Sequence, residues 1–420
     1  MALLNKAARV DGLVGRPELN GRQGFVLQFD ADKGRYSVRL AGEANTLALK
    51  PANLKLAVAP TGLTIDQQTV PDVVLAVMQG EALVDAELAS ACMKQLLKFM
   101  SGKSEETAAI EGGGVELIVP LLAAHVNTPL TSDLSRTGHP LWIGLCAAAN
   151  IVLSGLDTQH LGAVGALPSS AVRKQRAADA GIYGICMEIL KVHKTSDLQT
   201  MALSVIGNVT SGGEFPDTES RRIAAAKAGA ITATCDAMRL APHRSSVAAF
   251  GMTSIASICA GPTSKDVAAR RDEAVAHGAL ELTVEGMRRH EGVIGKHLMG
   301  GEHGQSAIML PGSVLHIGAL AIGFVVKPGV DEAKEAAAAR VQRALKAGVV
   351  DAATIVARAH PQKHSITLDT SEFVDLSHAL KEMIGGVFNA LGGDKAVQEL
   401  IEANIDAFEE IMAVMDNGRA

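Results

Sequence analysis

The residues that could do chemistry are gathered most densely in one glycine-rich stretch, residues 291–312. It holds His297 and His303 among six glycines and includes the sequence Gly-Lys-His. A phosphate-binding loop requires Gly-x4-Gly-Lys-Ser/Thr directly after a strand, and this stretch has neither the spacing nor the strand. The chain also contains no Gly-x-Ser-x-Gly and no His-Glu-x-x-His motif. The sequence therefore predicts no catalytic residues, no metal, no cofactor and a protein that is not an enzyme.

A second set of candidates is a column of histidines, twelve positions after a recurring glycine. The glycines are Gly113, Gly181, Gly278 and Gly348, and the histidines are His125, His193, His290 and His360; at Gly229 the same position holds Ala241. Two imidazoles on one zinc each lie ~2.1 Å from the ion, whereas packed helices stand ~8–10 Å apart. We therefore expect these histidines at helix C-termini, where they donate to the last carbonyl groups and complement the helix dipole.

A third column consists of arginines eight positions before the same glycines. Its members are Arg173, Arg221, Arg270 and Arg340, with Glu105 in the earliest unit. Two arrangements are open: an exposed basic stripe, or ion pairs with acids on the next unit. Ion pairing is the more common of the two.

Composition excludes several further classes of site. The five cysteines are isolated in expected helices without a Cys-x-x-Cys motif, which predicts buried, reduced thiols. Aromatic residues make up 3% of the chain, and this low share argues against a deep aromatic-lined pocket. We find neither a leader sequence nor an apolar run long enough to span a membrane. We therefore expect a cytoplasmic protein, with a nuclear location also open.

The elements that must position these columns repeat along the chain. Residues 221–261 predict three helices, at 221–228, 231–240 and 245–260, separated by Gly229 and Pro242. Comparable patterns recur from about Pro71 to Met415. The ends of the third helices align in a further column, which reads Asn150, Asn208, Ser257, Phe324 and Asn389. Self-similarity of this kind is typical of a solenoid, in which each unit buries its apolar face against the next.

This pattern resembles the armadillo family, whose units have a short helix, an Ala-Gly break, an apolar second helix and a third helix that carries Leu-x-Asn in its last turn. The resemblance implies a mainly α fold, a right-handed superhelix of about six to seven units over residues 71–420. Inserts between second and third helices, at 126–140, 291–312 and 361–372, should emerge along one edge. Atypical terminal units are expected at 71–100 and around Ala403-Asn404-Ile405.

In armadillo proteins that carry extended peptides, an asparagine on the third helix lines the concave groove and holds the peptide backbone with its donor and acceptor. The resemblance implies that Asn150, Asn208 and Asn389, with Ser257 in the same column, bind a protein partner or extended peptide. Bonding to the backbone of a neighbouring repeat is the alternative. Import adaptors of the importin-α type carry tryptophan one turn earlier, where this chain has Cys146, Ser204, Thr253, Leu320 and Gly385. We therefore do not expect nuclear-import signals to bind here.

Residues 1–57 have a strand-like period instead, with short runs separated by turns rich in Gly, Asn and Asp. The pattern resembles the small Src-homology-3-like, Tudor or KOW barrels, and it comprises Asn20-Gly21, Gly24, Val26, Phe29-Asp30, Arg35-Tyr36, Val38, Leu40, Leu49, Pro51 and Asn53-Leu54. We expect a bent barrel of five or so strands, then a linker at 58–70. Phe25 and Phe29 are four residues apart, and strand alternation would place both on the core face.

The N-terminal module also differs from the rest of the chain in charge. Its formal net charge is +4, whereas the remaining residues carry −10. Tyr36 with Arg22, Arg35 and Arg39 could form a weak basic binding surface on the barrel. Nucleic-acid binding at this surface is one interpretation, and a cap on the first repeat is the other.

These observations together predict a non-enzymatic scaffold or adaptor that binds protein partners in the groove of an armadillo-like solenoid. The alternative is a nucleic-acid-associated factor that binds through the basic barrel. An accessory subunit of an enzyme is a third hypothesis.

Overall fold

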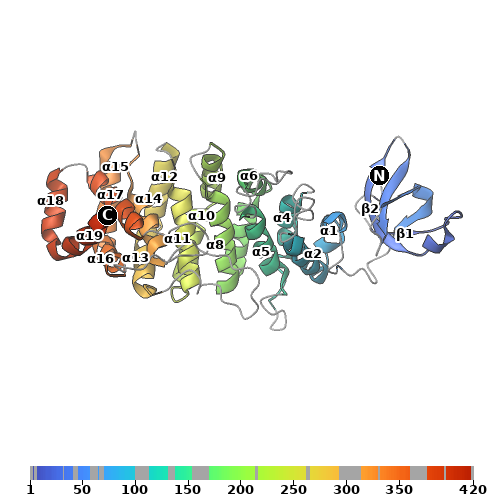
Figure 1. The fold of residues 1–420 in the computed structure, drawn as a ribbon, viewed down its shortest axis with the longest axis horizontal. Helices are drawn as coiled ribbons and strands as arrows, with labels where there is room; N and C mark the ends of the chain where they lie inside the picture. The colour runs from blue at the N-terminus through green and yellow to red at the C-terminus, as the bar shows by residue number, and fades with distance from the viewer. Residues whose placement is uncertain are drawn as a thin grey trace. The chain divides into compact units, whose positions relative to one another are not determined.

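The computed structural model describes residues 3, 7–31, 33–40, 46–56, 65, 71–99, 113–130, 138–153, 170–212, 216–261, 265–292, 314–329, 332–359, 376–391 and 394–417. The chain divides into two compact units, residues 1–185 and 186–420. Among the described residues, every strand lies before residue 57 and eighteen α-helices follow (Figure 1). The prediction of a mainly α protein with a small N-terminal β region is therefore confirmed.

The N-terminal region is a five-stranded antiparallel sheet with two short 3-10 turns. The strands are β1 (Ala7–Val10), β2 (Gln23–Asp30), β3 (Arg35–Leu40), β4 (Thr46–Leu49) and β5 (Leu54–Leu56). The turns are η1 (Pro17–Leu19) and η2 (Pro51–Asn53). The strand order is β4-β3-β2-β1-β5, and a small apolar core with Val10, Val26 and Val38 at its centre lies against one face.

The sheet is not a closed barrel, which corrects the prediction from the sequence. In the described part of the chain β4 pairs only with β3, and β5 pairs only with β1. Closure would need a ladder between these two outer strands, and they are four and three residues long. The two outer strands therefore remain as sheet edges.

A β-bulge in β2 corrects a second expectation. The register shifts between Val26 and Gln28, so that Val26 pairs with Val38 and Phe29 pairs with Tyr36. Because a bulge inserts one extra residue, strict alternation is broken between Phe25 and Phe29, and the side chain of Phe25 lies outside the described residues. Phe29 packs against the core and against Tyr36, with 4.7 Å between ring centroids.

The helices of the first unit begin after the sheet. They are α1 (Pro71–Met78), α2 (Ala86–Phe99), α4 (Gly114–His125), α5 (Pro140–Leu153) and α6 (Ser170–Asp179), with a 3-10 turn η3 (Glu81–Leu83), and α7 (Ile182–Val192) spans the division between the units. Helices α1 and α2 pack against each other, and α2 packs against α5. The expected terminal pair of helices at 71–100 is confirmed.

The second unit repeats a group of three helices. The first helices are α9 (Pro216–Lys227), α12 (Lys265–Ala276) and α15 (Lys334–Ala347). The second helices are α10 (Ala230–Leu240), α13 (Ala279–Arg289), α16 (Val349–Ala359) and α19 (Ile405–Asn417), the last preceded by α18 (Asp394–Ala403). The third helices are α8 (Ser196–Thr210), α11 (Ser245–Cys259), α14 (Val314–Val326) and α17 (Leu376–Leu391).

Equivalent helices of successive groups contact one another. The closest packing joins the third helices, α8 with α11, α11 with α14, and α14 with α17 (Figure 1). A Cβ added to Gly323 of α14 would lie 3.0 Å from the main chain of Glu382 in α17, so only glycine permits this approach. The second helices contact in the same order, α10 with α13, α13 with α16, and α16 with α19. Layers of equivalent helices therefore run through this unit.

The glycines that anchor the sequence columns have the backbone conformation that ends one helix and starts another. Gly113, Gly181, Gly229, Gly278 and Gly348 have φ angles of 93°, 90°, 84°, 78° and 91°. Residues other than glycine rarely adopt this left-handed backbone conformation. In the last unit the same break falls at Asn404, between α18 and α19. The predicted helix breaks are therefore confirmed, although α9 begins five residues before the predicted start at Arg221.

Several expectations fall outside the described ranges. They include Glu105, His360 and most of the residues in the inserts at 126–140, 291–312 and 361–372. Within the described ranges, none of the helices combines the length and the apolar character that a bilayer crossing requires.

The break glycines generate a stability prediction. Replacing Gly229 by Ala should destabilise the protein by about 1–2 kcal/mol, because the new Cβ has free space around it but alanine is strained at this φ. Gly184→Ala is the matched control: this exposed glycine lies inside α7, also with open space at the Cβ, and the change should stabilise by about 0.5–1 kcal/mol. Urea unfolding of both variants measures the difference. Equal shifts of the same sign would contradict the conformational explanation.

Candidate functional site

Each arginine of the predicted column is buried and caps the third helix of the group before it. Arg173, Arg221 and Arg270 are at most 3% exposed. Their Nε atoms donate to main-chain oxygens in the last turns of α5, α8 and α11, at Ile151 (2.7 Å), Val209 (2.9 Å) and Ile258 (2.7 Å). Carbonyl groups at a helix end have no partner within the helix, and a cation there also complements the dipole. The arginines therefore do not form an exposed stripe.

Two of these arginines also form ion pairs, but with the preceding group and not with the next one as expected. Arg270 Nη2 donates to both carboxylate oxygens of Glu219, at 2.9 and 3.1 Å. Arg340 Nη1 donates to Asp272 at 2.6 Å, and its Nη2 donates to Glu332 at 2.6 Å. Glu219 lies on α9 and Asp272 on α12, so each pair joins successive first helices.

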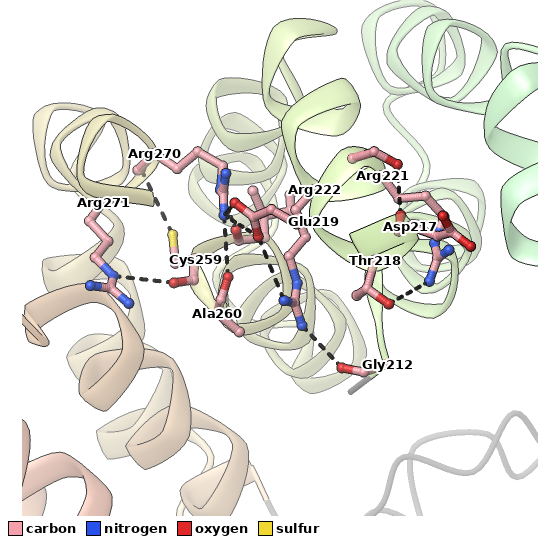
Figure 2. Close-up of polar contacts among 12 residues, drawn as sticks. Gly212, Asp217, Thr218, Glu219, Arg221, Arg222, Cys259, Ala260, Arg270 and Arg271 are labelled. Atoms are coloured by element: carbon pink, nitrogen blue, oxygen red, sulfur yellow. Dashed lines mark hydrogen bonds and ion pairs between the residues drawn. The ribbon is translucent and has the colours of Figure 1, made fainter. Parts of the chain in front are cut away.

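A second basic residue follows immediately in each of two groups and is also buried. Arg222 Nη2 donates to the main-chain oxygen of Gly212 at 3.1 Å, and Arg271 donates to that of Cys259 at 3.2 Å (Figure 2). Arg271 also donates to the main-chain oxygen of Lys327 at 2.7 Å. Burial lowers the pKa of Arg271 to about 10, which leaves it charged at neutral pH. Reasoning from the sequence missed this role, although the dibasic pairs at 173–174, 221–222 and 270–271 signal it.

The third helices of the second unit enclose a cavity of about 380 Å³. Its walls come from α11 and α14, closed by the chain after α8 and by Arg222 of α9. Four of its residues occupy equivalent positions of the repeat: Thr253 and Leu320 stand one turn before the asparagine column, and Ser257 and Phe324 stand in it. Ala256, His316, Ile317 and Lys327 complete much of the lining. The volume lies in the range of small ligand sites, ~300–1,000 Å³.

The three asparagines of the column differ in their contacts and in their exposure. Asn150 Nδ2 donates to the oxygen of Cys146 in its own helix, at 2.8 Å, and not to a neighbouring repeat. Asn208 is half-buried, and its Nδ2 atom has no hydrogen-bond partner among the described residues. Asn389 is exposed on α17. The cavity brings together Ser257 and Phe324, and neither Asn208 nor Asn389 lines it.

The histidines lie at helix C-termini as predicted, but two of them bond to a preceding group. The Nε2 atom of His125 lies 2.7 Å from the oxygen of Ala82, and that of His290 lies 3.1 Å from the oxygen of Pro242. These carbonyl groups lie 43 and 48 residues earlier in the chain, so the expected bond to the histidine's own helix is wrong. His193 is buried just after α7. These histidines join successive groups.

A further column, ten positions after four of the five break glycines, was also missed; after Gly113 the position holds Ala123. It contains Lys191, Arg239, Arg288 and Arg358. Arg239 donates to the oxygen of His277 in the next group, and Arg288 donates to Asp351 at 2.7 Å. Arg358 makes two bonds to Glu410, at 2.7 and 3.0 Å. Its constant spacing from the break glycines is the signal in the sequence that predicts it, as for the other columns. Because these pairs are exposed, each contributes ~0–1 kcal/mol.

Of the four residues expected to form a basic surface on the N-terminal sheet, the structure describes the side chains of three. Tyr36 is 3% exposed and belongs to the core, which corrects its placement on the surface. Arg22 is half-buried, whereas Arg35 is exposed and donates to the oxygen of Ala48 at 3.2 Å. The side chain of Arg39 lies outside the described residues.

The cysteines are free and buried, as predicted. Burial raises the pKa of Cys146, Cys186, Cys235 and Cys259 to about 12 and also raises the pKa of Cys92. Only the thiolate is nucleophilic. These thiols are therefore protonated and unreactive at neutral pH.

No protein-family model and no curated protein sequence matches the chain. Among solved structures, the chain is similar to an engineered protein from a structural-genomics consortium, with 17% identity and a TM-score of 0.48 over 76% of this chain and 97% of the other. A structure described as a computational design of self-assembling cyclic homo-oligomers gives 14% identity and a TM-score of 0.18, over 83% and 99% of the two chains. At these scores neither likeness bears on function.

The buried pair of Arg270 and Glu219 generates a stability prediction. Arg270→Met should cost about 3–5 kcal/mol, because it leaves a carboxylate with 17% side-chain exposure without its main partner. Adding Glu219→Gln should recover part of that loss, and the double-mutant cycle measures the coupling. Lys395→Met, which removes an exposed pair with Glu399, is the control and should change stability by less than about 0.5 kcal/mol. Additive effects of the two core changes would contradict the ion-pair assignment.

The Glu332 carboxylate generates a pH prediction. Its burial alone would raise the pKa, but hydrogen bonds from Arg340 and from the N–H of Gly329, with the charge of Arg340, hold it below its ordinary value of 4.5. A lowered folded-state pKa stabilises the fold above pH 4.5 and loses that contribution as the pH falls further. Urea unfolding at several pH values should therefore show wild type and Glu332→Gln converging below pH 4.5.

Glu188→Gln is the matched control for this pH dependence, since Glu188 is an exposed carboxylate inside α7 and not in its first turn. The difference in free energy of unfolding between this variant and the wild type should be the same at every pH. If Glu332→Gln also runs parallel to the wild type through the acid range, the ionic contact with Arg340 does not stabilise the folded state.

Proposed function

We propose that the chain is a non-enzymatic scaffold: an armadillo-like, right-handed superhelix whose third helices line a groove for an extended segment of a protein partner. The single observation that carries the proposal is the cavity formed at equivalent repeat positions of two adjacent third helices. Thr253 and Ser257 of α11 face the same hollow as Leu320 and Phe324 of α14. Ser257 and Phe324 stand in the column at which the resemblance to the armadillo family implies peptide contacts, although neither is the asparagine of that family.

The repeated contacts of the helices support the superhelix. Five break glycines with positive φ recur at the same point of each group. Capping arginines, carbonyl-bonded histidines and the exposed base ten residues after the glycine recur with them, and each joins one group to a neighbouring group. Units that bury their apolar faces only against their neighbours form one continuous outer surface. A partner can bind along one side of that surface.

The polar groups in the groove support a peptide ligand over a catalytic role. An extended peptide has one main-chain donor and one acceptor per residue. An asparagine or serine side chain can form hydrogen bonds with both, because it carries an acceptor and a donor. Ser257 is half-buried in the cavity wall, and Asn389 is exposed on α17. Among the described residues, no group of three or more His, Cys, Asp or Glu side chains could hold a metal ion.

Selection of displayed peptides against the full chain tests this proposal. Random peptides about twelve residues long, which span ~40 Å when extended, should yield binders. Ser257→Trp should weaken these binders at least ~10-fold, because an indole in the cavity wall fills the space for the ligand. Ala269→Trp on α12, an exposed position that does not line the cavity, is the matched control and should leave binding unchanged. If the selected peptides bind the Ser257→Trp variant as tightly as the wild type, or if no peptide binds, the groove assignment is contradicted.

A further inference from the structure

We propose that α19 binds an amphipathic helix of a protein partner, and that this helix carries Lys or Arg beside its apolar stripe. The surface that carries the proposal, called here the α19 face, consists of Ile405, Asp406, Glu409, Met412 and Ala413, all exposed. At about 100° per residue these positions lie on one side of the helix. None of them lines the cavity between α11 and α14, so the inference does not rest on the proposed function.

The repeat shows what covers the equivalent positions in other groups. Counted from the break at Asn404, the five positions are the first, second, fifth, eighth and ninth, and every residue at these positions of α10, α13 and α16 is buried. These helices each pack against the third helix of their own group, α11, α14 and α17. A Cβ added to Gly251 of α11 would lie 2.6 Å from the Cγ atom of Met238, which stands at the ninth position. A third helix therefore contacts this face directly.

The opposite side of α19 is already covered. This helix packs against α16, α17 and α18, and Phe408 and Ile411 are buried. Phe408 stacks on Phe388 of α17, with 5.7 Å between ring centroids. In the described part of the chain no third helix follows α19 (Figure 1). A helix on the α19 face would therefore continue the row of third helices formed by α8, α11, α14 and α17.

Two large apolar side chains on the α19 face favour a partner over water. Ile405 is 56% exposed and Met412 is 41% exposed. A terminal unit that meets only water has a polar outer face. The two residues are seven positions apart, which is about two helical turns, and this is the spacing of anchors between an amphipathic helix and its binding surface. The α19 face therefore fits a helix that has an apolar stripe of its own.

The acids beside these two residues determine the charge of the partner. Asp406 and Glu409 belong to the α19 face, and neither forms an ion pair within the described part of the chain. Glu402, at the end of α18, is a further exposed carboxylate. Complementary charges favour the correct partner, and like charges disfavour others. The partner helix is therefore expected to carry bases.

The described bases that contact these two helices do not neutralise Asp406 or Glu409. Lys395 of α18 lies 3.7 Å from Glu399. Arg358 of α16 makes two bonds to Glu410, at 2.7 and 3.0 Å. The negative charge of the α19 face is therefore left for Lys or Arg side chains of the partner.

Selection of displayed helical peptides against the full chain tests the proposal. Peptides of about fifteen residues suit the site, because α11, α14 and α17 have 15, 13 and 16 residues. Enriched peptides should combine aliphatic residues at helical spacing with Lys or Arg, and their binding should slow amide exchange in α19. Met412→Ser should weaken them about 10-fold, since it removes an apolar anchor. Leu240→Ser is the matched control, because Leu240 of α10 is 51% exposed, and it should leave binding unchanged.

A charge reversal tests the sign of the partner. Glu409→Lys should weaken the basic peptides at least about 3-fold and tighten the same peptides with Glu in place of Lys and Arg. Glu188→Lys makes an equal charge change at an exposed position inside α7 and should alter neither. Ser257→Trp should also leave the helical peptides bound, so that failure of the groove and failure of the α19 face are distinguishable.

Three results would overturn the proposal. The first is that no helical peptide binds, which would make the α19 face a solvated end. The second is that the enriched peptides bind the Met412→Ser variant as tightly as the wild type, because they then bind elsewhere. The third is that Glu188→Lys and Glu409→Lys weaken the basic peptides equally, because overall charge then explains the effect.

Discussion

The structure depends on one recurring constraint: the last carbonyl groups of each third helix need hydrogen-bond donors, and the donors come from the next helix in the chain. Arg221 reaches the end of α8 and Arg270 reaches the end of α11. A guanidinium has five N–H donors in a fixed fork, so one side chain can cap a helix and also bind a carboxylate of a neighbouring group, as Arg270 does. Burial of these cations is tolerated because they donate to main-chain oxygens and, in the case of Arg270, also to a carboxylate.

This capping joins the end of each of these third helices to the first helix that follows it in the chain. The helices α8, α11, α14 and α17 pack through glycine and small side chains, which brings equivalent positions of adjacent helices close together. A cavity then forms at Ser257 and Phe324 with Arg222 at its edge.

The sequence alone predicted the helix groups, since the break glycines require a left-handed backbone that few residues tolerate. Of the column proposed to bind a partner, Ser257 lines the cavity, whereas Asn208 and Asn389 do not. The sequence did not predict the partners of the arginines and histidines. Many of the acceptors are main-chain oxygens, which every residue has, so the residue types do not show which oxygen accepts the bond. The open sheet and the bulge in β2 were missed for a related reason: a bulge shifts the alternation without changing the residues. Arg222 was missed because only the first arginine of each pair was aligned.

Native-state hydrogen exchange of the full chain, followed by mass spectrometry, tests most directly whether repeated groups joined to their neighbours make up this protein. Units with nearest-neighbour contacts unfold in steps. Opening free energies should therefore change from group to group across residues 186–420, with α18 and α19 opening first and α11 last. If every helix in this range exchanges with one common free energy, the unit behaves as a single closed core, and the scaffold built from repeated groups is contradicted.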